Sequence, residues 1–243
     1  RWLQSFSLIW IGGSLLSEKL AGTARKFNIR LAPCYGATET TAMVTAQKPE
    51  SFLSGINNYG NSLVDVELRL DSEKRLQIKT SRLATGAFIN GKFKRIINNE
   101  GWWASGDMAE LIDNDIGRQL KVIGRIDTAI NSGGETVYPE SLQAKLLNVT
   151  QEAQMPIEEI LLVAISDDEW GQRLVALVRT YNQSENINTS RLFLDLKELV
   201  TRWPPFERPV SWYNCPGLKR NNQGKWELKK WKLWIKDNVR LSK

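Results

Sequence analysis

The sequence predicts a two-part protein, an α/β region followed by a smaller region of α+β character. A short apolar run at residues 7–11 ends in a Gly-Gly-Ser turn, and helical spacing of apolar residues follows it. Strict alternation of apolar and polar residues over 64–70 indicates half-exposed antiparallel strands. A further set of strands and helices follows residue 126, so we expect a domain boundary between residues 1–126 and 127–243.

The first region is expected to open with a parallel α/β unit. Strands are predicted at residues 7–11 and 29–32, with a helix over 15–27 between them. In such units, ligands bind beyond the carboxyl ends of the strands. Two polar segments fall at that edge, Gly12-Gly13-Ser14 and the stretch CYGATETT at residues 34–41. The sequence therefore places a candidate site there.

The rest of the first region is expected to be antiparallel. Alternation predicts strands at residues 64–70, 75–80 and 120–123, and two bracketing glycines predict a turn at 101–107.

The second region has elements of its own. Pro139 suits the first turn of a helix, and the apolar residues after it keep helical spacing. Two strands are expected at 160–165 and 173–180, around a polar turn. A second helix over 191–203 is expected to stop at a Pro-Pro pair.

Composition excludes several kinds of chemistry. The 243 residues include no histidine, which rules out Ser-His-Asp and Cys-His catalysis and His-ligated metals within them. Cys34 and Cys215 are far apart and lack metal-ligand spacing, so we expect free thiols in a reducing compartment, the cytoplasm. No apolar run approaches the roughly 20 residues of a membrane helix. The chain begins at Arg1 instead of Met, and we expect it to start inside a larger protein.

The net charge of +6 is concentrated near the C-terminus. Residues 218–243 hold nine Lys or Arg and two acidic residues, interleaved with Trp226, Trp231 and Trp234. Such a segment could bind nucleic acid or another anionic surface. The alternative is a terminal helix whose tryptophans pack on the domain while its charges face water.

Thr38 and Glu39 form the first candidate binding pair. A hydroxyl in a turn before a helix, with free backbone amides, favours phosphate oxygens. A neighbouring carboxylate suits Mg²⁺, which takes one or two carboxylates together with phosphate oxygens. The alternative is plain capping, with Thr38 as the N-cap of the helix.

The other candidates are residues at single turns. Glycines at 12–13 would let a flat ligand approach the backbone. Asp107 could accept hydrogen bonds from both hydroxyls of a ribose, and Arg125 could reach ribose or phosphate. Ser132-Gly133-Gly134-Glu135 could line a ligand channel, and Lys225, in a tight turn, could neutralise charge that develops on a phosphate. Each has a structural alternative: an ordinary turn, a turn-stabilising Asp, a surface salt bridge or a solvated lysine.

Four motifs, taken in order, resemble those of the acyl-adenylate-forming ligases. They are YGATETT, GWWASGD, GRIDTAINSGGETVYPESLQ and QGKWE, and they extend over nearly the whole chain. This superfamily includes acyl-CoA synthetases, luciferases and peptide-synthetase adenylation domains. The resemblance implies the C-terminal part of a large AMP-binding domain at residues 1–126, followed by a small, mobile α+β domain at 127–243.

The resemblance also implies an activity and its small molecules. Members of the superfamily join a carboxylic acid to ATP, which gives an acyl-AMP and pyrophosphate, and the thiol of CoA then displaces AMP to give a thioester. ATP, Mg²⁺ and CoA are therefore expected together with a small carboxylic acid, and no nucleic acid is expected as a partner.

Residue roles are implied by the same resemblance. In the first region, it implies adenine binding for Gly12, Gly13, Ser14 and Tyr35, an acyl-pocket wall at Gly36, phosphate and Mg²⁺ binding for Thr38 and Glu39, and ribose binding for Asp107 and Arg125. In the second region, it implies a hinge at Asp127 and a pantetheine channel at Ser132, Gly133, Gly134 and Glu135. Catalysis of adenylation is implied for Lys225, together with Thr38 and Glu39. Rotation of the small domain would exchange Lys225 for the pantetheine-channel loop between the two half-reactions.

One feature of the superfamily is missing. Its Ser/Thr/Gly-rich phosphate loop, which ends in lysine, does not occur among the 243 residues. We therefore expect a truncation or fragment that does not turn over ATP unaided. The alternative is a domain that has lost catalysis and serves as a binding module with a basic tail.

The acid is suggested by finer resemblance. The compact Gly-Gly-Ser turn, the short C-terminal domain and the tail NNQGKWELKKW look most like o-succinylbenzoate–CoA ligases, which act in menaquinone or phylloquinone biosynthesis. Another aryl- or fatty-acid–CoA ligase of the superfamily is the alternative.

Overall fold

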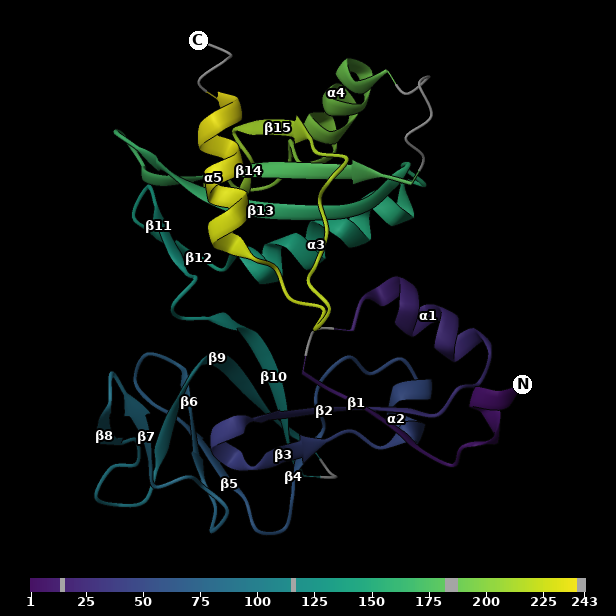
Figure 1. The fold of residues 1–243 in the computed structure, drawn as a ribbon. Coiled ribbons are helices and arrows are strands. Elements are labelled where there is room, and N and C mark those ends of the chain that lie inside the picture. Colours follow the sequence, from purple (N-terminus) through teal and green to yellow (C-terminus); the bar gives the residue numbers. More distant parts are fainter. Residues whose placement is uncertain (14–15, 115–116, 182–187, 240–243) are drawn as a thin grey trace. The chain divides into compact units, whose positions relative to one another are not determined.

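The chain folds into two compact units (Figure 1). The structure, a computed structural model, describes residues 1–13, 16–114, 117–181 and 188–239. The first unit runs from Arg1 to Asp127 and the second from Thr128 to Lys243.

The first unit is built on an eight-stranded sheet with the order β1-β2-β3-β4-β10-β9-β6-β5. As the sequence predicts, β1 and β2 are parallel, whereas the other neighbouring pairs are antiparallel. The strands are β1 (Ile9–Ile11), β2 (Leu31–Ala37), β3 (Ala42–Ala46), β4 (Asn61–Ser62), β5 (Glu67–Leu70), β6 (Arg75–Lys79), β9 (Trp103–Asn114) and β10 (Gly117–Arg125).

Short helices flank the parallel pair. Helix α1 (Glu18–Lys26) begins three residues later than predicted, because the Ser17 hydroxyl caps it by accepting a hydrogen bond from the Leu20 amide. Helix α2 (Pro49–Leu53) begins at a proline, and a single 3₁₀ turn, η1 (Trp2–Ser5), opens the chain. Buried side chains of α1, α2 and β2 form one small core.

A separate hairpin joins β7 (Gly86–Ile89) to β8 (Lys92–Arg95). Its two-residue turn, Asn90-Gly91, has positive φ at both positions (51° and 75°), which suits the twist of a tight hairpin.

Two of the predicted turns are wrong. Cys34 to Ala37 belong to β2, and Thr38–Thr40 form a single 3₁₀ turn (η2) that leads into β3 instead of a helix. Residues 103–107 lie in β9, and the turn precedes them at 98–102. Both segments contain Gly and Ala, which carry little strand propensity, so pairing with neighbouring strands decides their conformation.

The second unit is built on a five-stranded sheet. Its order is β12-β11-β14-β13, with β15 pairing parallel to β14 on the other side. The elements are β11 (Ile130–Ser132), β12 (Glu135–Val137), α3 (Pro139–Glu152), β13 (Ile157–Asp167), β14 (Gly171–Thr180), α4 (Thr189–Leu199), η3 (Pro205–Glu207), β15 (Ser211–Asn214) and α5 (Leu228–Val239).

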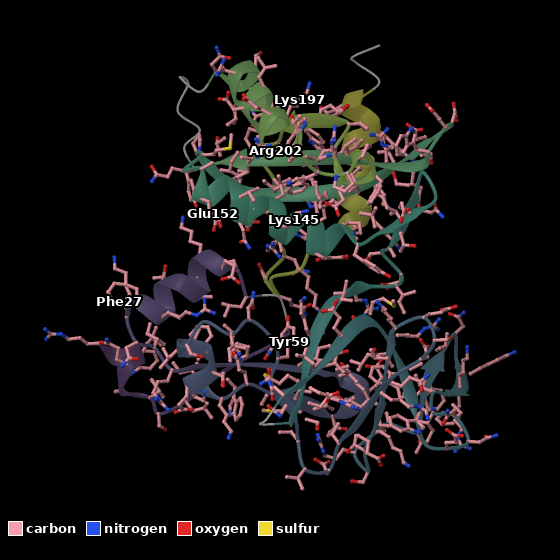
Figure 2. The ribbon with its side chains drawn as sticks, turned by 180° about the vertical axis from the view of Figure 1, so that it is seen from behind. Phe27, Tyr59, Lys145, Glu152, Lys197 and Arg202 are labelled. Atoms are coloured by element: carbon pink, nitrogen blue, oxygen red, sulfur yellow. The ribbon has the colours of Figure 1, made fainter. Side chains whose placement is uncertain are left out.

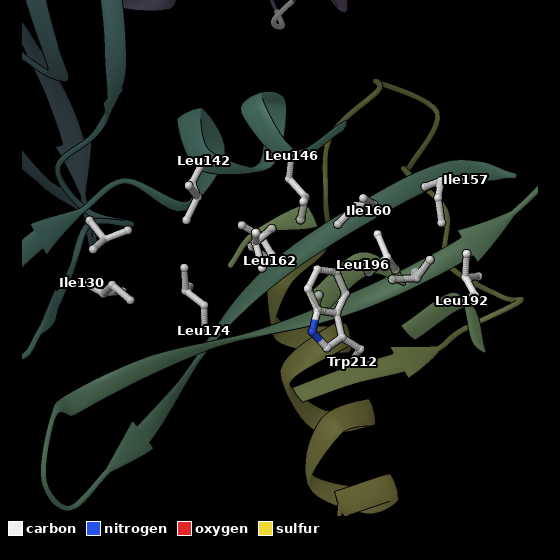
Figure 3. Close-up of a cluster of buried hydrophobic side chains, with 14 residues drawn as sticks. Ile130, Leu142, Leu146, Ile157, Ile160, Leu162, Leu174, Leu192, Leu196 and Trp212 are labelled. Atoms are coloured by element: carbon white, nitrogen blue, oxygen red, sulfur yellow. The ribbon is translucent and has the colours of Figure 1, made fainter. Parts of the chain in front are cut away.

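The long hairpin of β13 and β14 is covered on both faces. Alternate residues such as Ile160 and Leu174 pack with α3 and α4, as Figure 3 shows. Their neighbours Leu161 and Val175 belong to a second core, which α5 completes. The outer sides of the helices are charged, for example at Lys145 on α3 (Figure 2). An antiparallel hairpin buried on both faces explains the nearly continuous apolar runs of these two strands.

The tryptophan-rich tail is part of this second core. Trp231 and Ile235 of α5 are 2% and 4% exposed and pack against the sheet, while the lysines of α5 are exposed. The packing alternative for the tail is therefore the one that the structure shows. Among the described residues, no helix combines the length and apolarity that crossing a membrane requires.

Replacing Trp231 tests the contribution of α5 to stability. We expect Trp231→Ala to lower the free energy of unfolding of the second unit by about 3–5 kcal/mol, because it removes a buried aromatic ring. Leu233→Ala, on the same helix but 60% exposed, is the matched control and should change it by less than about 1 kcal/mol. Guanidinium unfolding followed by circular dichroism measures both; equal effects would mean that α5 does not pack as described.

Candidate functional site

The turn between β2 and β3 is shaped by a close approach of two backbones. A Cβ on Gly36 would lie 2.1 Å from the Ala42 carbonyl oxygen, so no side chain fits there. The pairing of β2 with β3 shifts register between Tyr35 and Gly36, and Thr41 and Ala42 have positive φ (57° and 132°). Such φ values are costly for residues other than glycine, so surrounding bonds must hold the turn.

The three threonines of this turn have different environments. The Thr40 hydroxyl is buried, lying 2.9 Å from the Ala37 amide and 2.7 Å from the Ala42 carbonyl oxygen. The Thr41 hydroxyl donates to the Arg82 carbonyl oxygen at 2.8 Å. Thr38 is exposed, and its side chain makes no hydrogen bond with any described residue. Of three candidate hydroxyls, one is thus free for a ligand.

Thr38 is not a helix cap. The N-cap of the 3₁₀ turn is Ala37, and no helix follows, which removes the capping alternative. It also removes the argument for phosphate binding at a helix N-terminus. What remains is an exposed hydroxyl beside the half-buried Glu39, whose carboxylate has no ion-pair partner among the described residues.

A connected polar cluster lies at β2, β9 and β10. The Tyr35 hydroxyl donates to Oδ2 of Asp107, which is 9% exposed. The Arg125 guanidinium lies 3.7 Å from Oδ1 of Asp107 and donates two hydrogen bonds, of 2.9 and 3.0 Å, to the carboxylate of Asp127. A Cβ on Gly106 would lie 2.8 Å from this guanidinium, so the glycine makes room for it. The structure therefore brings together four of the predicted residues.

Charge and burial shift the acidity of this cluster. Burial raises the pKa of the Tyr35 phenol above its usual range, and the Asp107 carboxylate raises that pKa further. Hydrogen bonds from Arg125 hold the pKa of the Asp127 carboxyl below its usual range. At neutral pH the Tyr35 hydroxyl is therefore a donor, and Asp127 is a charged partner of Arg125.

Tyr59 is a neighbour that the sequence did not indicate. Its ring meets that of Tyr35 edge to face, with centroids 6.1 Å apart, and burial raises the pKa of its phenol. Tyr59 is labelled in Figure 2. A lone tyrosine in the loop before β4 carries no motif, so only the fold brings it to the cluster.

The glycine turn after β1 is less informative. A Cβ on Gly12 would lie 2.8 Å from the Cys34 sulfur, so this glycine allows close packing on β2. Gly13 has a φ of 83°, which favours glycine. Ser14 lies outside the described residues.

In the second unit, the predicted channel loop is a short hairpin turn. Ser132 ends β11 and Glu135 begins β12, and a Cβ on Gly133 would lie 2.6 Å from the Trp170 ring. Ser132 is fully buried, and its hydroxyl has no partner in the described part of the chain. The loop rests on Trp170, which the sequence did not single out.

Lys225 lies in a well-anchored turn. The Asn221 side chain accepts from the amides of Gln223 and Lys225, and Arg220 donates to the Gly224 carbonyl oxygen while stacking on Trp226. Lys225 is exposed, and no ion pair in the described residues involves it. The turn thus presents one ammonium group to solvent.

No preformed metal cage is present among the described residues, because no three His, Cys, Asp or Glu side chains gather. The single carboxylate of Glu39 fits Mg²⁺, which commonly takes one or two protein carboxylates and completes its shell with phosphate oxygens and water.

Comparisons with known proteins show what the chain resembles. No family model matches the chain. The chain is 28% identical over 96% of its length to the 2-succinylbenzoate–CoA ligase of Salmonella typhimurium, and 26% identical over 95% to that of Escherichia coli. It spans about half the length of these relatives, 47% and 46%.

Solved structures agree with the relatives. Wild-type E. coli MenE with a bound m-phenylether-linked analogue of OSB-AMS has a TM-score of 0.70 at 26% identity, over 96% of this chain and 47% of that one. MenE from Bacillus subtilis, in complex with the acyl-adenylate intermediate OSB-AMP, has a TM-score of 0.76 at 21% identity, over 94% of this chain and 46% of that one. A third, the B. subtilis enzyme in complex with ATP and magnesium ion, has a TM-score of 0.69 at 20% identity, over 95% of this chain and 49% of that one.

The fold is that of the acyl-adenylate-forming ligases, as the sequence motifs predicted. The chain resembles 2-succinylbenzoate–CoA ligases over nearly its whole length, so the finer resemblance to these enzymes is confirmed.

Two glycine substitutions test the geometry of the β2–β3 turn. Gly36→Ala should lower the free energy of unfolding of the first unit by about 1–3 kcal/mol or more, because the new methyl group meets backbone atoms that cannot move aside. Gly22→Ala, in α1 with nothing within 4 Å of its Cβ, should raise it by about 0.5–1 kcal/mol. Thermal unfolding of both variants gives the comparison, and a neutral Gly36→Ala would contradict the described turn.

Proposed function

We propose that the chain is the C-terminal half of an ATP-dependent acid–CoA ligase that acts on o-succinylbenzoate, in menaquinone or phylloquinone biosynthesis. The observation that carries the proposal is the similarity to named 2-succinylbenzoate–CoA ligases, which extends over at least 93% of the chain in the first four relatives. In this proposal, residues 1–126 complete the large AMP-binding domain and 127–243 form the small mobile domain. The two free cysteines are consistent with the cytoplasm as its location.

The proposed reaction has two steps, adenylation of the acid and transfer of the acyl group to CoA. A carboxylate oxygen of the acid attacks the α-phosphorus of ATP, which forms the acyl-AMP and releases pyrophosphate. The CoA thiol, after losing its proton, attacks the acyl carbon, which forms the thioester and releases AMP.

Nucleotide binding is proposed for the cluster on β2, β9 and β10. The flat face of Tyr35 would stack on adenine while its hydroxyl holds Asp107. A carboxylate offers about four acceptor positions, so Asp107 can serve Tyr35 and still accept hydrogen bonds from ribose hydroxyls. Arg125, half-exposed beside Asp107, would contribute a donor to the same ribose.

Phosphate binding is proposed for the exposed part of the β2–β3 turn. The free Thr38 hydroxyl would donate to a phosphate oxygen, and Glu39 would bind Mg²⁺. When bound, Mg²⁺ would neutralise charge on the phosphates. The proposal also keeps the place beside adenine for Gly12, Gly13 and Ser14, and the place beside the acyl group for Gly36.

The second unit would supply groups to each half-reaction in turn. Lys225, an exposed ammonium, would stabilise charge on the α-phosphate and carboxylate during adenylation. The loop from Ser132 to Glu135, which includes Gly133 and Gly134, would face the pantetheine arm during thiol transfer. Asp127, the last residue of the first unit, would be the hinge.

The acid is tested with the complete reading frame. We expect AMP formation from ATP that depends on CoA and on o-succinylbenzoate, and none with coumarate or a medium-chain fatty acid; the assay follows AMP by chromatography. Activity with another acid alone would keep the mechanism and overturn the substrate. No AMP with any acid would favour a binding module.

Lys225 is tested by separating the half-reactions. Lys225→Ala should slow acyl-AMP formation by roughly 100-fold or more, because it removes an electrostatic contact made in that step. Transfer from supplied acyl-AMP to CoA should change far less. Lys229→Ala, which removes an exposed lysine at the start of α5, is the matched control. Equal loss in both half-reactions would refute the assigned role.

A further inference from the structure

Arg82 lies behind the β2–β3 turn, on the segment that connects β6 to β7. Its guanidinium donates to the carbonyl oxygens of Thr40 and Met43, each at 3.3 Å. The backbone of the same segment adds two bonds: the Thr41 hydroxyl donates to the Arg82 carbonyl oxygen at 2.8 Å, and the Ala84 amide donates to the Glu39 carbonyl oxygen at 2.8 Å. The turn is therefore bound to this segment at Glu39, Thr40, Thr41 and Met43.

A second layer of contacts holds Arg82 in place. Its Nε donates to Oδ2 of Asp65 at 2.7 Å, and Thr80 donates to the same oxygen at 2.8 Å. These hydrogen bonds lower the pKa of Asp65 to about 2, so the pair stays charged under any ordinary assay condition. Only an arginine can supply this set of bonds, because its planar fork of donors reaches a carboxylate and two carbonyl oxygens together.

The turn needs such support from outside. Thr41 and Ala42 have positive φ, which costs free energy. Within the turn, the Thr40 hydroxyl bonds to backbone atoms of Ala37 and Ala42. Arg82 contacts the carbonyl oxygens on either side of these two residues. Loss of its bonds would let the turn relax, and Thr38 and Glu39 belong to the part that would move.

We propose that Arg82 is a positioning residue that holds the β2–β3 turn in the conformation required for Thr38 and Glu39 to meet the phosphates and Mg²⁺. The proposal deepens the proposed function and rests on it for the catalytic part, whereas the anchoring of the turn can be measured without any activity. Sequence gives no hint of the role, since Arg82 lies outside the four motifs.

A purely stabilising salt bridge would behave differently. Arg82 and Asp65 have side chains that are 32% and 43% exposed, and exposed pairs usually contribute little to the free energy of unfolding. A positioning role predicts a large effect on catalysis with MgATP and a small effect on unfolding. Arg118→Ala is the matched control, because it breaks another exposed Arg–Asp pair of the same unit. That pair lies between β9 and β10, and in the described part of the chain it makes no hydrogen bond with the β2–β3 turn.

The experiment compares Arg82→Ala, Arg82→Lys and Arg118→Ala in the complete protein. Hydrogen–deuterium exchange should be faster over residues 36–44 in Arg82→Ala, and unchanged over β13 and β14. The kcat/KM for ATP should fall roughly 10- to 100-fold, as is typical when a residue that orients ligands is lost. Higher Mg²⁺ should recover part of the loss, added guanidinium ion should restore part of it to Arg82→Ala, and Arg82→Lys should recover little.

The outcomes separate the two levels of the proposal. Unchanged exchange over 36–44 in Arg82→Ala would overturn the anchoring role, and faster exchange with wild-type kinetics would overturn the positioning role. If Arg118→Ala produced the same kinetic loss, Arg82 would have no special role. A wild-type protein that makes no acyl-AMP, combined with faster exchange in Arg82→Ala, would overturn the proposed function while supporting the anchor.

Discussion

At Gly36 the backbone of β2 lies in close contact with the backbone of β3, and the shape of the β2–β3 turn depends on that contact. A Cβ on Gly36 would lie 2.1 Å from the Ala42 carbonyl oxygen, so β2 and β3 can pair this closely only because position 36 has no side chain. The register shift beside Gly36 adds a residue to β3, and an irregularity of this kind increases the local twist. Tyr35, the residue before Gly36, donates to Asp107, and the carboxylate of Asp107 also lies beside Arg125. A single steric constraint thus connects the shape of the turn to the polar cluster.

In the second unit the corresponding constraint is hydrophobic. β13 and β14 present apolar side chains on both faces, so each face requires its own cover. Helices α3 and α4 cover one face, and Trp231 with Ile235 of α5 helps to cover the other. The lysines of α5 lie on the solvent-facing side of a helix whose other side is packed on the sheet. A charge pattern that resembles an anionic-surface binder is accounted for by ordinary amphipathic packing.

The sequence predicted the parallel start, the long strands of the second unit and the helix after Pro139, because apolar periodicity is strong there. It failed at Cys34–Ala37 and at 103–107, where small and polar residues are held extended by their neighbours in the sheet. The motifs identified Tyr35, Asp107, Arg125 and Asp127, which the structure joins. Tyr59, Arg82 and Trp170 were not predicted, since their contacts bridge segments that are distant in sequence and follow no local pattern.

The bonds that shape the β2–β3 turn end almost entirely on backbone amides and carbonyl oxygens. Its geometry is therefore largely indifferent to the chemistry of whatever side chain stands at position 38 or 39. For protein engineering this separates two tasks that usually interfere with each other. The framework of the turn can be left alone while the side chains at positions 38 and 39 are varied, so the ligand chemistry proposed for them is open to redesign without rebuilding the loop.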